Sequence, residues 1–122
     1  YKGQVFSTDG EVGVGQHGSM SKYEMNNLLI CYGKSFREGE RILSPTGNVD
    51  ILPTVLKLLD VPIPETVEGR VLNEALLENG EKIVSTLMTH TASRSLAEGQ
   101  YIQQLSVSNV NGTLYLEQGN AL

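Results

Sequence analysis

The sequence lacks several features that mark particular classes of protein. Its one cysteine, Cys31, excludes an internal disulfide, so the cysteine count does not fix the redox compartment. The chain has nine lysines and arginines and 14 aspartates and glutamates, which give it a net charge of −5. This balance argues against a nucleic-acid polymer or an anionic membrane surface as the partner, because both need clustered cations. No apolar run approaches the length of a transmembrane helix, so we predict no membrane span.

Local catalytic and metal-binding motifs are missing as well. His17 and His90 are too far apart for a His-x-x-x-His pair, and there is no CxxC, P-loop or Gly-x-Ser-x-Gly elbow. His17 has the more suggestive setting, because small neighbours leave its ring accessible, although the glycine-rich stretch around it also suits an ordinary terminal loop. We interpret His90 as a surface or partly buried side chain, and Cys31 as a small buried hydrophobe.

The first half of the chain predicts two helices and one strand. Ser21-x-x-Glu24 is a capping-box pattern that predicts a helical turn over residues 22–25. The apolar run 27–32 predicts a strand buried on both faces. Residues 50–60 predict a mostly buried helix, because Asp50, Thr54 and Lys57 form only a narrow polar stripe on it.

The second half predicts mainly antiparallel β-structure. A short helix is expected over residues 72–78 and a strand over 81–95. Asn111-Gly112 predicts a two-residue hairpin turn between strands 101–109 and 114–118. The resulting register places four apolar side chains on one face, which we expect to lie on a core: Leu105, Val107, Leu114 and Leu116.

An ordered series of residues resembles the C-terminal end of the alkaline phosphatase superfamily. The closest resemblance is to the type I phosphodiesterase/nucleotide pyrophosphatase branch, and sulfatases and phosphopentomutases share the wider scaffold. The series consists of Gly15-Gln16-His17-Gly18, Met25, Leu29-Ile30, Gly33, Phe36, Gly39, the run from Asn48 to Leu59, Pro62-Ile63-Pro64 and Glu68-Gly69-Arg70-Val71-Leu72.

The resemblance implies an α/β fold in which the buried strand and the covering helix are part of an alkaline-phosphatase-like sandwich, followed by the C-terminal antiparallel hairpin predicted above. It divides the chain into a remnant of the catalytic domain (1–80) and a β segment (81–122). The family hydrolyses phosphate esters of small molecules with two metal ions, usually zinc, and a Thr or Ser nucleophile. The histidine of its Gly-x-His-Gly motif, here His17, ligates one zinc. Relatives are often secreted or periplasmic.

The same resemblance implies that most of the active site lies outside these residues. The family's nucleophile and its remaining metal ligands lie upstream of such a segment, and the chain begins with Tyr1 rather than Met. We therefore expect a piece of a longer chain, inactive by itself and a weak zinc binder, because a catalytic zinc takes about three protein ligands.

Three alternatives stay open at this point. The segment could belong to a sulfatase or a phosphomonoesterase of the same superfamily, or it could be a non-catalytic interaction module with a vestigial likeness. If neighbouring strands are absent, the exposed edge and the apolar helix face would favour self-association.

Overall fold

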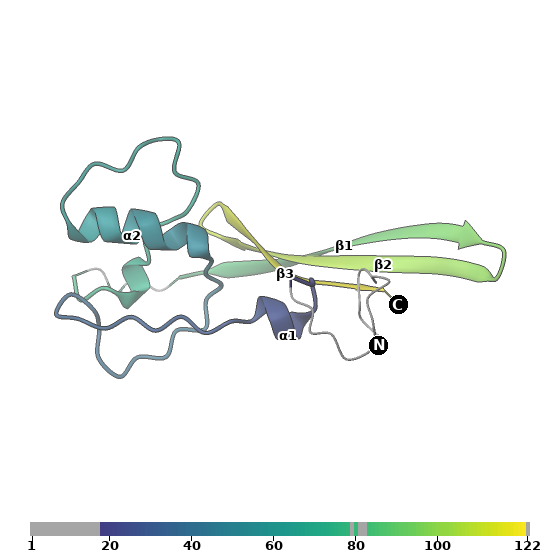
Figure 1. Cartoon of the computed structure of the whole chain (residues 1–122), viewed down its shortest axis with the longest axis horizontal. Coiled ribbons are helices and arrows are strands. Elements are labelled where there is room, and N and C mark those ends of the chain that lie inside the picture. The colour runs from purple at the N-terminus through teal and green to yellow at the C-terminus, as the bar shows by residue number, and fades with distance from the viewer. Residues whose placement is uncertain (1–17, 79, 81–82, 122) are drawn as a thin grey trace. The chain divides into compact units, whose positions relative to one another are not determined.

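The computed structural model describes residues 18–78, 80 and 83–121 and divides the chain into two compact units. One unit combines Tyr1–Leu28, Leu87–Ser108 and Leu116–Leu122, and the other combines Leu29–Thr86 and Asn109–Tyr115. The described elements are short helices in the first two thirds of the chain and three strands in the last third (Figure 1). The fold class is a small α/β domain with an antiparallel sheet.

Three strands form the sheet in the order β1-β2-β3. They are β1 (Ser85–Leu96), β2 (Gly99–Val110) and β3 (Thr113–Ala121). The predicted hairpin turn is confirmed, because Asn111 and Gly112 lie between β2 and β3 with φ of 51° and 95°. Two successive positive φ angles define the turn type that matches the twist of paired strands. The Asn109 side chain also accepts a hydrogen bond of 2.8 Å from the Gly112 N–H.

The predicted inward face of the hairpin is confirmed at Val107 in β2 and is wrong for β3, and Leu105 in β2 is only partly buried. Val107 is buried, but Leu114 and Leu116 are 61% and 51% exposed, and Tyr115 between them is buried instead. Adjacent strand residues point to opposite faces, so burial of Tyr115 turns both leucines outward. Tyr115 is buried because its hydroxyl forms hydrogen bonds with the fully buried carboxylate of Asp50.

The predicted helix is present as a 3-10 turn, η1 (Asn48–Asp50), that continues into α2 (Ile51–Leu58). Its predicted burial is wrong. The polar positions Asp50 and Thr54 are buried, whereas apolar side chains of the helix are about half exposed, including Ile51 (46%), Leu52 (54%) and Val55 (44%). The helix therefore turns its hydrogen-bonding face inward and leaves an apolar face without cover among the described residues.

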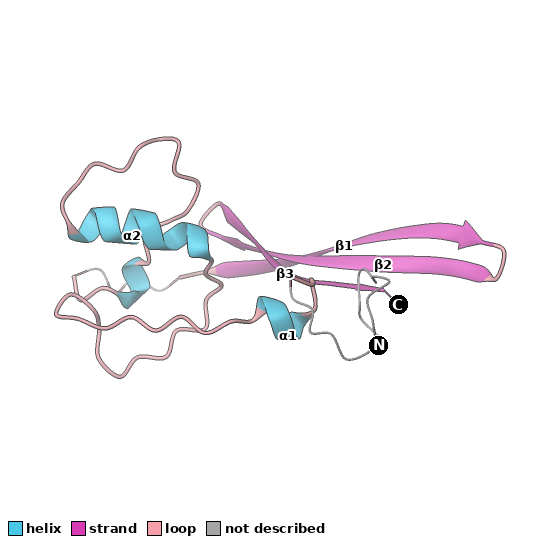
Figure 2. Cartoon of the chain, viewed as in Figure 1, coloured by secondary structure: helices cyan, strands magenta, loops and turns pink. Residues whose placement is uncertain are grey.

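The predicted buried strand 27–32 is also wrong. Residues 27–32 form a loop with exposed side chains, drawn in pink in Figure 2, and Cys31 is an exposed free thiol rather than a buried hydrophobe. The helical turn before the loop is confirmed as α1 (Lys22–Met25). Its Glu24 carboxylate accepts a hydrogen bond from the Ser19 N–H instead of closing a capping box with Ser21.

The short helix expected at 72–78 is a 3-10 turn, η2 (Asn73–Ala75), followed by an isolated antiparallel bridge between Phe36 and Leu76. Leu72 and Leu76 are buried on either side of this turn. Within residues 18–78, 80 and 83–121, no helix combines the length and apolarity that crossing a membrane requires.

Candidate functional site

The one site residue that the sequence predicts, His17, lies outside the described residues. Among the residues that the structure describes, no group of three or more His, Cys, Asp and Glu side chains could hold a metal ion. His90, the other histidine, lies exposed on β1. The metal site implied by the resemblance is therefore not formed by the described part of the chain alone.

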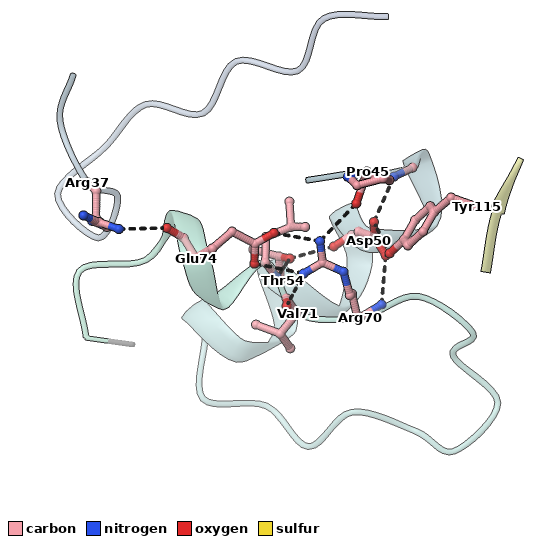
Figure 3. Close-up of polar contacts among 10 residues, drawn as sticks. Arg37, Pro45, Asp50, Thr54, Arg70, Val71, Glu74 and Tyr115 are labelled. Carbon is pink, nitrogen blue, oxygen red and sulfur yellow. Dashed lines mark hydrogen bonds and ion pairs between the residues drawn. The ribbon is translucent and has the colours of Figure 1, made fainter. Parts of the chain in front are cut away.

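The described residues do contain a buried polar cluster, which we call the Asp50 cluster. Its members belong to one compact unit and come from segments far apart in the sequence (Figure 3): Asp50, Thr54, Arg70, Glu74 and Tyr115. Two carboxylates and one guanidinium at this location give the cluster a formal charge of −1.

Asp50 is at the centre and is fully buried. Its Oδ2 accepts a hydrogen bond from the Gly47 N–H (2.8 Å) and its Oδ1 accepts one from the Arg70 N–H (2.9 Å). The Tyr115 hydroxyl lies 2.9 Å from Oδ1 and 2.8 Å from Oδ2. Gly47 precedes the 3-10 turn, so the first of these bonds also caps the start of the helix. Three donors aimed at one carboxylate compensate for its removal from water.

Arg70 and Glu74 form a buried ion pair next to the Asp50 carboxylate. The guanidinium donates two parallel bonds to Glu74, from Nη1 to Oε2 (2.9 Å) and from Nη2 to Oε1 (2.7 Å). Their side chains are only 11% and 7% exposed. Burial alone would lower the pKa of Arg70, but the hydrogen bonds and charge of Glu74 outweigh it and raise this pKa above its usual value. Arg70 therefore stays cationic in the folded protein.

Thr54 and Gly69 fix the backbone around the cluster. The Thr54 hydroxyl donates to the Asp50 carbonyl (2.7 Å) and accepts from the Leu72 N–H (3.0 Å), so it ties α2 to the segment that carries Arg70. A Cβ at Gly69 would collide with the carbonyl of Val49. The absence of a side chain at Gly69 is what allows these two backbone segments to approach so closely.

Burial raises the pKa of the Tyr115 phenol to about 12, and the hydrogen bond to Asp50 adds to the rise, whereas the nearby Arg70 opposes it. The protonated phenol is therefore favoured in the folded state relative to an unfolded pKa of about 10. By linkage, this contribution to stability is fully present below about pH 10 and is lost as the pH rises from about 10 toward 12.

We expect Tyr115→Phe to lower the free energy of unfolding by about 1.5–3 kcal/mol at neutral pH, because it removes a hydrogen bond to a charged acceptor. The loss relative to the natural protein should shrink at about pH 11, where the phenol of the unfolded state is already ionised. Denaturant unfolding at neutral pH and at about pH 11 measures this loss of stability. Tyr23→Phe is the matched control, because Tyr23 is 83% exposed, and an equal pH effect in both variants would contradict the assignment.

The chemistry of the Asp50 cluster suits a structural support rather than a substrate site. The carboxylate, hydroxyl and guanidinium groups bind one another or backbone groups, including the Pro45 carbonyl, which lies 3.1 Å from Arg70 Nη2. Among the described residues, Arg70 Nε is buried without a hydrogen-bond partner. The sequence did contain a signal for the cluster, since the four-residue spacing of Asp50 and Thr54 places both on one side of an otherwise apolar helix.

Comparison with known proteins gives one similarity. No family model matches the chain, and no solved structure matches it. Steryl-sulfatase of Homo sapiens is 28% identical over 112 residues, an alignment that covers 84% of this chain and 19% of the relative. The chain thus spans about a fifth of that protein's length. Steryl-sulfatase belongs to the alkaline phosphatase superfamily, so the similarity supports that superfamily without singling out its phosphodiesterase branch.

Proposed function

We propose that these 122 residues are part of a sulfatase-type hydrolase of the alkaline phosphatase superfamily. The observation that carries the proposal is the similarity to steryl-sulfatase, which extends over most of this chain. The motifs of the sequence favour phosphate esters as substrates, with sulfate esters as an alternative. A relative that is named for its sulfatase activity moves the preference to sulfate esters.

In this proposal the segment supplies one metal ligand and a structural support. By the family resemblance, His17 would hold a metal ion, zinc in the phosphate-ester members, and that ion would supply stabilisation of the negative charge on the ester oxygens. The Asp50 cluster holds the start of α2, the Arg70 segment and Tyr115 of β3 together. The nucleophile and the other ligands belong to residues outside this segment.

A phosphodiesterase is the second candidate, and the ordered motif series favours it. That series includes Gly15-Gln16-His17-Gly18 and the run from Asn48 to Leu59. The two candidates differ in substrate, because a sulfate monoester carries one negative charge and one organic group, whereas a phosphodiester carries one negative charge and two organic groups. Residues outside this segment must make that choice.

The experiment is a direct comparison of two chromogenic substrates with the complete protein. We expect kcat/KM for 4-nitrophenyl sulfate to exceed that for bis(4-nitrophenyl) phosphate by about 100-fold. A preference in the reverse direction would identify the phosphodiesterase. Hydrolysis of neither ester by metal-loaded protein would favour the non-catalytic module. A His17→Ala preparation purified in the same way reports any contaminating hydrolase.

A further inference from the structure

The turn between β2 and β3 places an exposed asparagine directly before an unshielded glycine. Asn111 and Gly112 are both exposed. No described atom outside residues 111–113 lies within 4 Å of the position that a Cβ at Gly112 would occupy. The backbone nitrogen of Gly112 is therefore open to approach by the side chain of Asn111. Asparagine is among the thermally labile residues of proteins, and an open nitrogen in the following residue is what its breakdown requires.

The breakdown is an attack within the chain. The Gly112 nitrogen gives its proton to water and attacks the side-chain carbonyl carbon of Asn111, so that a C–N bond forms and ammonia leaves. The product is a five-membered succinimide ring. Water then opens the ring at either of its two carbonyl groups and leaves an aspartyl or an isoaspartyl residue at position 111. The reaction as a whole consumes water and releases ammonia.

Asn109 opposes this reaction in the folded chain. Its side-chain Oδ1 accepts a hydrogen bond of 2.8 Å from the Gly112 N–H, which holds the proton that must leave. Asn111 and Gly112 also have positive φ angles, 51° and 95°, in a two-residue turn whose ends are fixed by paired strands. Ring closure requires the peptide group between these residues to rotate until the nitrogen lone pair faces the Asn111 side chain. That rotation breaks the hydrogen bond to Asn109.

We propose that Asn111 is a site of spontaneous deamidation and that Asn109 is the residue that slows this modification in the folded protein. Asn48 provides a contrast within the same chain. It is exposed as well, but it precedes Val49, whose two branches at Cβ shield the nitrogen that would attack. Exposure alone therefore does not make an asparagine of this chain a modification site.

Modification of Asn111 has a route to the Asp50 cluster through β3. An isoaspartyl residue adds a methylene carbon to the main chain, and a two-residue turn accommodates it only if the pairing of the strands changes. Val110 and Tyr115, on the two sides of the turn, are 0% and 7% exposed, and the Tyr115 hydroxyl binds the Asp50 carboxylate. A displaced β3 would move that hydroxyl, so the chemistry of the turn is linked to the stability of the unit.

Peptide mapping by mass spectrometry of the complete protein, incubated in mildly alkaline buffer, measures the modification. We expect aspartyl and isoaspartyl products at position 111 to form at least about tenfold more slowly in native protein than in urea-denatured protein. Mapping separates them from products of Asn79-Gly80, the other Asn-Gly pair of the chain. Equal rates in native and denatured protein, or no product at position 111 in denatured protein, would overturn the proposal.

Two variants at position 109 separate the hydrogen bond from the general effect of folding. Asn109→Ala removes the acceptor, and we expect the native variant to deamidate at position 111 about tenfold faster than the natural protein. Asn109→Asp keeps an acceptor oxygen, so its rate should stay within about twofold of the natural rate. An alanine variant that reacts at the natural rate, or equal acceleration in both variants, would overturn the proposal. Asn109→Val, which lacks an acceptor but favours strands, takes the place of an alanine variant that does not fold.

Discussion

Asp50→Ala is expected to lower the free energy of unfolding by about 3–5 kcal/mol. The carboxylate is fully buried and accepts from the Gly47 N–H, the Arg70 N–H and the Tyr115 hydroxyl. Alanine would leave these three donors without their acceptor, the Tyr115 hydroxyl at a buried position and the two N–H groups at partly buried ones. It would also leave Arg70 with Glu74 as its one carboxylate neighbour in the cluster. The loss therefore exceeds that of a single hydrogen bond.

Denaturant unfolding of the complete protein measures this effect. Glu65→Ala is the control for removing an acidic side chain, because Glu65 is exposed and should change stability by less than about 0.5 kcal/mol. Asp50→Asn keeps the shape but turns an NH₂ group toward a donor, so we expect it to remain clearly destabilising. An Asp50→Ala protein as stable as the Glu65→Ala protein would show that the cluster does not hold the fold together.

The sequence correctly predicted the turn and the helix that are specified by residues adjacent in the chain. Asn111-Gly112 specifies its turn through backbone conformations that these two residues adopt readily, and the structure has that turn. The helix that begins near Asp50 and ends before Pro62 follows from its apolar content and from residues that start and stop helices. In both cases a few neighbouring residues contain the whole signal.

The sequence failed where partners distant along the chain decide burial. Periodicity assigns the apolar side of α2 to the core, but Asp50 binds groups 20 and 65 residues away, and these bonds draw the polar side inward. The same bonds bury Tyr115 rather than its leucine neighbours. The 28–32 segment has the composition of a buried strand, but no strand pairs with it among the described residues.

For the candidate sites too, the sequence predicts single residues but not the distant residues that complete a site. The spacing of Asp50 and Thr54 hinted at a polar contact, but nothing local to either residue identifies Arg70, Glu74 or Tyr115 as the other members. His17 came from the Gly15-Gln16-His17-Gly18 motif and its resemblance to a family, and it lies outside the described residues.

His17→Ala is expected to reduce bound metal and activity of the complete protein together. Loss of one of about three protein ligands leaves an incomplete coordination shell, so we expect the variant to lose close to one metal ion per chain. Activity should fall by about 100-fold or more, since the ion that His17 would hold would stabilise the charge that develops on the ester. His90→Ala is the matched control, because His90 lies exposed on β1 and should keep both metal and activity.

The most direct test of the hydrolase assignment is the metal content of these two variants, determined by plasma mass spectrometry on protein of known concentration. The account predicts bound metal in the natural protein, the same metal content in His90→Ala, and about one ion fewer per chain in His17→Ala, with ester hydrolysis falling in the last variant only. Normal metal content and normal hydrolysis in His17→Ala would contradict it.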